Sequence, residues 1–205
     1  MDLLHEVIVV DGHSTDGTPE LVRSLGHKVV VQNGNGYGRA VQSGLEQATG
    51  EYLTFFDADG SYNPEALTRL SAELEKGFDV VYCSRYLPNS GSDDDTPIRL
   101  LGNKIFTGAM RYLHGVQLSD ALFLYPLIRR EVLKKIVMNS TGFDWCIEFP
   151  IRVHQAGLKY TEIPSRERKR LAGVSKVNAL WDGLDILRTL CALKFTKPNP
   201  TKALT

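Results

Sequence analysis

Short apolar runs alternate with amphipathic segments along the first 86 residues of the chain. Residues 7–10 (VIVV) are a continuous β-branched run, which is typical of a strand that is buried on both faces. Further strands are predicted at residues 29–31, 52–56 and 79–83. The spacing of apolar side chains predicts helices at residues 18–25, 37–48 and 64–77, with Ser14 or Thr15 capping the first. This alternation predicts an α/β fold with a mostly parallel sheet flanked by helices.

The second half of the chain departs from this regular alternation. Residues 88–95 form a polar loop that ends in three successive aspartates. Residues 98–113 have the spacing of an amphipathic helix, whose apolar face either packs on the core or contacts a bilayer surface or lipid acceptor. The remaining predicted elements are helices at residues 129–137, 144–156 and 176–193, a strand at 160–163 and a basic loop at 165–176.

Length, charge and cysteine usage narrow the class of protein. The chain has 205 residues, about one domain's worth, and we expect a single domain over residues 1–205. Lys+Arg and Asp+Glu both total 24, so there is no global attraction to nucleic acid. Because no apolar run approaches the roughly 18 residues of a membrane-spanning helix and no signal peptide is evident, we expect a cytoplasmic protein, either free or peripheral on the cytosolic membrane face. The three cysteines have no metal-binding spacing and are expected to be buried thiols.

Polar residues follow three of the predicted strands, where an open α/β sheet binds its ligands. These residues are Asp11, the pair Asp57 and Asp59, and Arg85. A lone carboxylate there is more often a turn former or helix cap, which is our interpretation of Asp16. The Asp57–Asp59 pair brings two hard oxygen ligands into one crevice, which favours binding of Mg²⁺ or Mn²⁺ together with a substrate diphosphate over a decorated turn.

The loop at residues 165–176 carries five basic side chains and a glycine. It suits a phosphate clamp, and a solvated charged loop is the alternative. We favour phosphate binding at Arg170 and Lys176 and leave the two interpretations equal for the other basic residues.

Several motifs follow one another in a fixed order. They are DGHSTDGT at residues 11–18, GYGRA at 36–40, DADG at 57–60, SRY at 84–86, FDWCIE at 143–148, EIP at 162–164 and RLAGVSK at 170–176. This series resembles the family 2 glycosyltransferases of GT-A fold. The resemblance is nearest to the dolichyl-phosphate mannose synthase and polyprenyl-phosphate glycosyltransferase branch.

The resemblance implies an inverting transferase that moves a hexose from a nucleotide-diphosphate sugar, of GDP-mannose or UDP-glucose type, to a polyprenyl or dolichyl phosphate with Mg²⁺ or Mn²⁺. It implies a nucleotide-sugar half at residues 1–86 and an acceptor-side half at 87–205. The resemblance implies that the metal is bound by Asp57 and Asp59. It implies that the donor is bound by Asp11, Asp57, Arg85, Ser175 and Lys176. The residues that it implies for catalysis are Asp59, Glu148 and Arg170.

Two departures from the family pattern keep other functions open. The chain begins at what resembles the family's second strand, so we expect a GT-A fold that is incomplete at its N-terminus. Phe123 and Leu124 stand where relatives carry a phosphate-binding turn. The alternatives are transfer to a soluble sugar or glycan hydroxyl, and a noncatalytic relative that binds nucleotide, sugar or a partner protein. Candidate general bases are Asp120, Asp144 and Glu148, although Glu148 is also interpretable as a buried structural carboxylate and an ionised phosphate acceptor needs little base.

Overall fold

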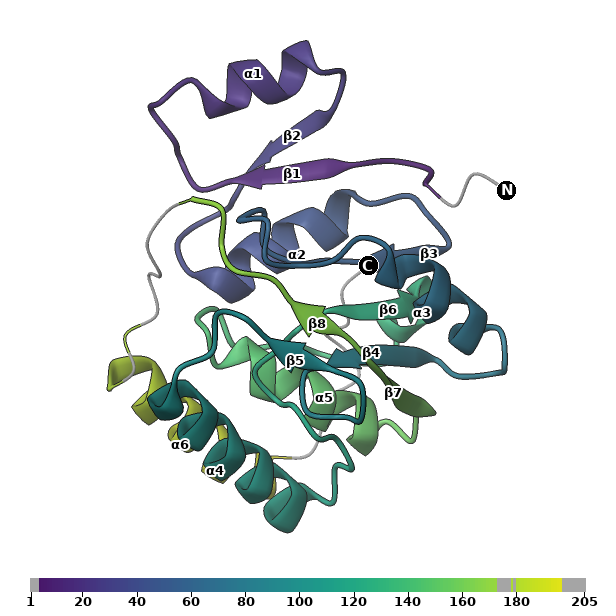
Figure 1. The fold of residues 1–205 in the computed structure, drawn as a ribbon, viewed down its shortest axis with the longest axis vertical. Coiled ribbons are helices and arrows are strands. Elements are labelled where there is room, and N and C mark those ends of the chain that lie inside the picture. Colours follow the sequence, from purple (N-terminus) through teal and green to yellow (C-terminus); the bar gives the residue numbers. More distant parts are fainter. Residues whose placement is uncertain (1–3, 173–177, 179, 197–205) are drawn as a thin grey trace.

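The structure is a computed structural model that describes residues 4–172, 178 and 180–196. Strands and helices alternate along the chain, and helices cover both faces of the central sheet (Figure 1). The strands are β1 (Ile8–Asp11), β2 (Lys28–Val31), β3 (Tyr52–Thr54), β4 (Val80–Ser84), β5 (Gly91–Ser92), β6 (Pro126–Arg129), β7 (Tyr160–Pro164) and β8 (Arg166–Glu167). The helices are α1 (Thr18–Ser24), α2 (Tyr37–Gln47), α3 (Ala66–Leu74), α4 (Pro97–His114), η1 (Arg130–Val132), α5 (Trp145–Gln155) and α6 (Trp181–Phe195).

The central sheet has the strand order β3-β6-β4-β7. Strand β4 runs parallel to β7, whereas β6 is antiparallel to both β3 and β4. Two parallel pairs accompany this sheet, β1 with β2 and β5 with β8. The predicted α/β fold with mostly parallel strands is therefore confirmed, and β6 is the antiparallel member.

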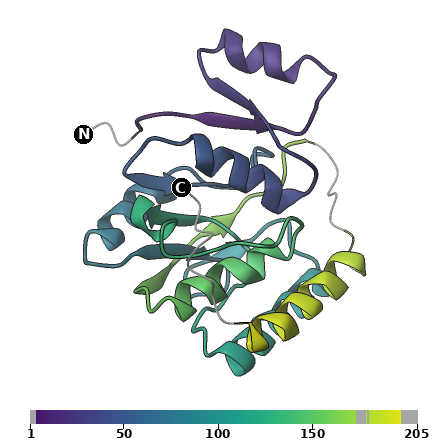
Figure 2. The same cartoon turned by 180° about the vertical axis from the view of Figure 1, so that it is seen from behind.

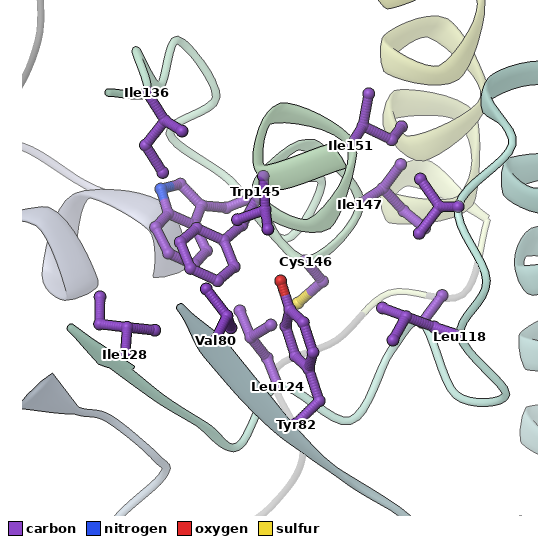
Figure 3. Packing of buried hydrophobic residues seen from close by; sticks show 14 of the residues in the cluster. Val80, Tyr82, Leu118, Leu124, Ile128, Ile136, Trp145, Cys146, Ile147 and Ile151 are labelled. Carbon is purple, nitrogen blue, oxygen red and sulfur yellow. The ribbon is translucent and has the colours of Figure 1, made fainter. Parts of the chain in front are cut away.

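Strand β4 separates two hydrophobic clusters because its side chains alternate between the faces of the sheet. Val80 and Tyr82 belong to the cluster under α5, and Val81 and Cys83 to the cluster under α3. All residues of β4 are buried, as expected for a strand with helices on both faces. Figure 3 shows the α5 side, where Trp145 lies near Ile128 and Val80.

Helix α2 joins the β1–β2 pair to the main core. Leu45 on α2 is buried in the cluster under α5, and Gly44 faces Val10 of β1 so closely that a Cβ there would lie 2.9 Å from the valine Cγ2. Before β1, the Glu6 carboxylate accepts hydrogen bonds from the backbone of Thr49 and Gly50, just ahead of β3. These contacts tie the chain just before β1 to the chain just before β3.

Helices α4 and α6 lie side by side at the end of the molecule opposite α1 (Figures 1 and 2). The buried residues of α4 are Asn103, Thr107 and Met110, while Leu101 and Ile105 are exposed. Packing on the core, one of the two alternatives for residues 98–113, is therefore observed for Phe106, Met110 and Leu113 but not for Leu101 and Ile105.

Three local predictions were also wrong. Residues 129–137 were expected to form a helix, but Arg129 closes β6 and only the short η1 follows, because pairing with β3 and β4 overrides local propensity. Helix α1 has Gly17 rather than Ser14 or Thr15 at its N-cap, and Asp16 accepts from the Thr18 backbone, as its structural interpretation predicts. Cys83 and Cys146 are buried, but Cys191 is exposed.

Within the part of the chain that the structure describes, no helix is both long and apolar enough to span a bilayer.

Candidate active site

The candidate site lies where β3 and β4 end and the β8 segment approaches them. Leu53 is the buried residue of β3, and beyond the strand the chain turns through Asp57 to Ser61. Arg85 follows β4 directly. The charges of Asp59, Arg170 and Glu167 all act on the Asp57 carboxylate, so these four residues share one electrostatic site.

Asp57 is a carboxylate that the fold holds at an energetic cost. Burial and the neighbouring Asp59 charge raise the pKa of Asp57 to about 6, while Arg170 lowers it. Two adjacent carboxylates in a sheltered position create a demand for positive charge. Arg170 already neutralises part of this negative charge, and a cation bound between the aspartates would neutralise more.

Asp59 is held in place through both of its carboxylate oxygens. Oδ1 accepts hydrogen bonds from the Ser61 backbone N–H at 3.0 Å and the Ser61 hydroxyl at 2.6 Å. Oδ2 lies 3.2 Å from Nη2 of Arg170. The structure thus brings Asp57, Asp59 and Arg170 together, and their roles in metal and phosphate binding stay predictions.

Arg85 is the centre of a buried polar network at the end of β4. Its Nε lies 2.8 Å from Oδ2 of Asp120, and Nη2 donates to Oδ1 at 3.0 Å, which makes the pair bidentate. Nη1 donates to Glu167 at 2.9 Å, and the guanidinium stacks over the Phe123 ring at 4.8 Å from its centroid. Arg85 therefore links β4 to β8 and leaves the Asp120 carboxylate occupied as an acceptor.

Helix α4 contributes to this network through residues that sequence reasoning missed. The Asn103 side chain donates to Asp120 at 2.5 Å, and Thr107 donates to the Asn103 side-chain oxygen at 2.8 Å. Glu167, which also accepts from Ser92, was missed as well. A signal was available in each case, since Asn103 and Thr107 are polar residues one helical turn apart and Glu167 is the one acid in the run RERKR at residues 166–170.

Glu148 has a different setting from the aspartates of the site. It is 1% exposed, and Oε2 accepts from the backbone N–H of Asn139 at 2.9 Å and of Ser140 at 2.6 Å. Oε1 lies 3.2 Å from Nε of Arg152, which is also buried. These contacts favour the structural interpretation of Glu148, and its catalytic role stays a prediction.

Asp11 and Asp144, two further predicted residues, also accept hydrogen bonds in the structure. Asp11 is buried at the end of β1, where its Oδ2 accepts from the Ser14 backbone N–H at 3.0 Å. Hydrogen bonds from the Ser14 hydroxyl and backbone lower the pKa of Asp11, so it is ionised at neutral pH. Asp144 accepts a hydrogen bond from Thr189 of α6. Ser175 and Lys176 lie outside the described residues.

The chain matches the family described as glycosyl transferase family 2 over residues 2–137, and it belongs to that family. Glycosyltransferase AglJ of Haloferax volcanii is 33% identical over 78% of this chain and 52% of its own length, so this chain spans about half of AglJ. The polyprenol monophosphomannose synthase of Mycolicibacterium smegmatis is 32% identical over 84% of this chain and 70% of that protein. The dolichyl-phosphate hexose transferase of Haloferax volcanii is 30% identical over 90% of this chain and 79% of that protein.

A solved structure with the same fold is glucosyl-3-phosphoglycerate synthase from Mycobacterium tuberculosis in complex with Mn²⁺, UDP-glucose and phosphoglyceric acid. It aligns with a TM-score of 0.73 at 21% identity over 94% of this chain and 69% of that chain. The fold is therefore GT-A. The family resemblance seen in the ordered motifs is confirmed, and the names of the relatives agree with the polyprenyl-phosphate branch.

Proposed function

We propose that the protein is an inverting glycosyltransferase that moves a hexose from a nucleotide-diphosphate sugar to a polyprenyl or dolichyl phosphate. The observation that carries the proposal is the placement of Asp57 and Asp59 beside Arg170 at the end of β3, in a member of glycosyl transferase family 2. The relatives named above as polyprenol monophosphomannose synthase and dolichyl-phosphate hexose transferase support the acceptor class.

The residues present fit a divalent cation. Asp57 and Asp59 are hard oxygen ligands, and the raised pKa of Asp57 shows that the pair favours added positive charge. Among the residues that the structure describes, no three His, Cys, Asp or Glu side chains gather into a metal-holding group. Two carboxylates suit an ion that takes its other ligands from substrate phosphates and water. Bound there, Mg²⁺ or Mn²⁺ would neutralise charge on the leaving diphosphate. The Mn²⁺ complex of the structural neighbour supports this choice of ion.

The chain's own side chains divide the remaining work. In this proposal Arg170, which lies beside Asp59, donates two parallel hydrogen bonds to diphosphate oxygens, and Asp11 at the end of β1 contacts the nucleotide. Arg85 holds the floor of the site through Asp120 and Glu167. A lipid phosphate reaches the site already ionised, so attack on the sugar needs no strong general base.

Peripheral membrane contact is part of the proposal. We define the α4/α6 face as the exposed apolar residues Ile98, Leu101, Ile105, Trp181, Leu184 and Leu187. Exposed basic residues of the same helices, Lys104, Arg111 and Arg188 among them, stand beside this face. Apolar side chains flanked by positive charge match the interfacial zone of an anionic membrane, which would present a lipid-phosphate acceptor.

The test is a transfer assay with UDP-glucose and GDP-mannose as donors and a short-chain polyprenyl phosphate in vesicles as acceptor. Asp57→Asn and Asp59→Asn are each expected to lower the rate by ~100-fold or more because the charge stabilisation of the leaving group is lost. Glu131→Gln, an exposed acid paired with Lys134, is the matched control and should leave the rate unchanged. If the protein transferred the hexose to a soluble glycan and not to the lipid phosphate, the proposed acceptor class would be wrong. Full activity of both aspartate variants would overturn the proposal.

A further inference from the structure

The segment from Arg168 to Leu171 is bound to the turn that carries the aspartates. The Arg168 backbone N–H donates to the Ser61 carbonyl at 2.8 Å, and the Leu171 N–H donates to the Asp59 carbonyl at 2.9 Å. Leu171 covers Gly60 so closely that a Cβ at Gly60 would lie 2.5 Å from the leucine Cδ1. This approach and the positive φ of 82° at Gly60 both require glycine.

These backbone bonds deliver the Arg170 guanidinium to Asp59. Nη2 of Arg170 is 3.2 Å from Oδ2, and the two side chains are 27% and 12% exposed. Because Ser61 already occupies Oδ1, the oxygen facing Arg170 is the one that a metal ion would need. The contact is sheltered, so solvent screens it less than an ion pair on the open surface.

We infer that Arg170 is a stand-in cation, which neutralises Asp59 before the metal binds and competes with the divalent ion for Oδ2. The inference rests on the proposed function, since it takes the same two aspartates as metal ligands. It extends the proposed function because Arg170 first pairs with Asp59 and then, once the metal is bound, with the donor diphosphate.

Charge repulsion makes the two cations exclusive at this oxygen. A divalent ion and a guanidinium on one carboxylate oxygen would lie a few ångströms apart, where like charges repel strongly in a sheltered site. Metal binding therefore breaks the Arg170–Asp59 contact and frees the guanidinium. The nearest new anion would be the donor diphosphate on the same metal, which the planar guanidinium can hold through two hydrogen bonds. Metal and donor are thereby bound cooperatively, and each alone is bound less tightly.

The experiment is a titration of the protein with Mn²⁺ alone, in which electron paramagnetic resonance reports free Mn²⁺ without any catalytic turnover. Arg170→Gln is expected to bind Mn²⁺ roughly threefold or more tightly than the unchanged protein, because the competing ion pair is gone. Arg168→Gln is the matched control. It removes the same charge from the same segment, but its guanidinium contacts Asn63 and Glu65 rather than Asp59. Its Mn²⁺ affinity should stay within about 1.5-fold of the unchanged protein, since exposed charges are well screened.

In a second titration, with UDP or GDP at saturating Mn²⁺, the substitution of Arg170 should weaken binding where it tightened binding of Mn²⁺ alone. Here Arg170→Gln should bind the nucleotide at least several-fold more weakly, because the diphosphate loses a charged partner. Equal Mn²⁺ affinity in Arg170→Gln and the unchanged protein would overturn the stand-in role, and so would equal tightening in both arginine variants. Failure of every variant to bind Mn²⁺, with and without nucleotide, would instead overturn the proposed function itself.

Discussion

Asp57 and Glu148 are both sheltered carboxylates, but their surroundings differ. Glu148 is satisfied by two backbone N–H groups and by Arg152, which is what a structural carboxylate requires. Asp57 instead faces the like charge of Asp59, and its pKa is raised. Ligand sites tend to hold groups in such unfavourable states, because the ligand relieves the strain when it binds.

The raised pKa of Asp57 predicts how stability depends on pH. The folded state binds a proton at about pH 6 and the unfolded state at its ordinary value of 3.8, so ionised Asp57 opposes folding above about pH 6. Asp57→Asn should therefore increase the free energy of unfolding at pH 7.5 by on the order of 1–3 kcal/mol. The gain should shrink as the pH falls from about 6 towards 3.8 and vanish at about pH 3, where both states are protonated. Urea denaturation at the two pH values measures this.

Asp59→Asn is the control for that experiment. Removing its charge relieves the repulsion on Asp57 but also breaks the pairing with Arg170 and Ser61, so Asp59→Asn should stabilise the protein less than Asp57→Asn does at pH 7.5. Destabilisation by Asp57→Asn at pH 7.5 would contradict the assignment of unfavourable burial to Asp57.

Glu148→Gln separates the structural from the catalytic role. Loss of the charge leaves Arg152 buried without its partner, so the free energy of unfolding should fall by roughly 3 kcal/mol. The turnover of the folded enzyme, measured well below its melting temperature, should change by less than about threefold because the pair lies outside the reacting groups. A variant of unchanged stability that loses transfer ~100-fold would show that Glu148 is catalytic after all.

Among the elements, α2 and α5 depend on one close contact. A Cβ at Gly38 would lie 2.7 Å from Cδ1 of the buried Trp145 and 2.9 Å from the Ser140 carbonyl oxygen. Gly38→Ala is therefore expected to destabilise the protein by about 1–3 kcal/mol through overpacking, measured by thermal or urea denaturation.

Gly108, in the middle of α4, provides the matched comparison. A Cβ there meets nothing within 4 Å, so Gly108→Ala should stabilise the protein by about 0.5–1 kcal/mol through helix propensity alone. If both substitutions had the same sign, the α2–α5 contact would not be the cause of the Gly38 effect.

For the whole molecule, the position of the α4/α6 face predicts how it meets a membrane. Replacement of Leu101 and Ile105 by serine should weaken binding to anionic vesicles, measured by sedimentation, by about tenfold. The reason is that two apolar side chains, exposed in the structure, would no longer be buried in the bilayer interface. High salt should weaken it further.

Leu21 on α1 and Leu25 at its C-cap are the control pair for this measurement. They are 60% and 65% exposed, much like Leu101 at 60%, but α1 lies at the opposite end of the molecule (Figure 2). Their replacement by serine should leave vesicle binding unchanged. Equal losses from both pairs, or from neither, would contradict membrane contact through the α4/α6 face.

The order of strands and helices in the first half of the chain, and the position of the aspartate pair, could be predicted from the amino-acid sequence. Apolar periodicity and the glycine and proline residues between runs are local signals, and they act the same way in any fold. A buried run that ends at residue 56 places Asp57 and Asp59 at the carboxyl end of a strand without any knowledge of its neighbours. The ordered motifs identified the family for the same reason.

Three features depend on contacts between distant parts of the chain: which side of α4 is buried, where residues 126–129 pair, and which carboxylate Arg170 contacts. Helix α4 buries Asn103 because its side chain donates to Asp120, and Thr107 because it donates in turn to the Asn103 side-chain oxygen. The Asp120 carboxylate that this chain of hydrogen bonds serves comes from another part of the sequence. Strand β6 forms because β3 and β4 both pair with it. The Arg170–Asp59 contact joins residues 111 positions apart, counted as 170 − 59. Such long-range contacts leave no periodic trace in a sequence, because each depends on elements that must first come together in the fold.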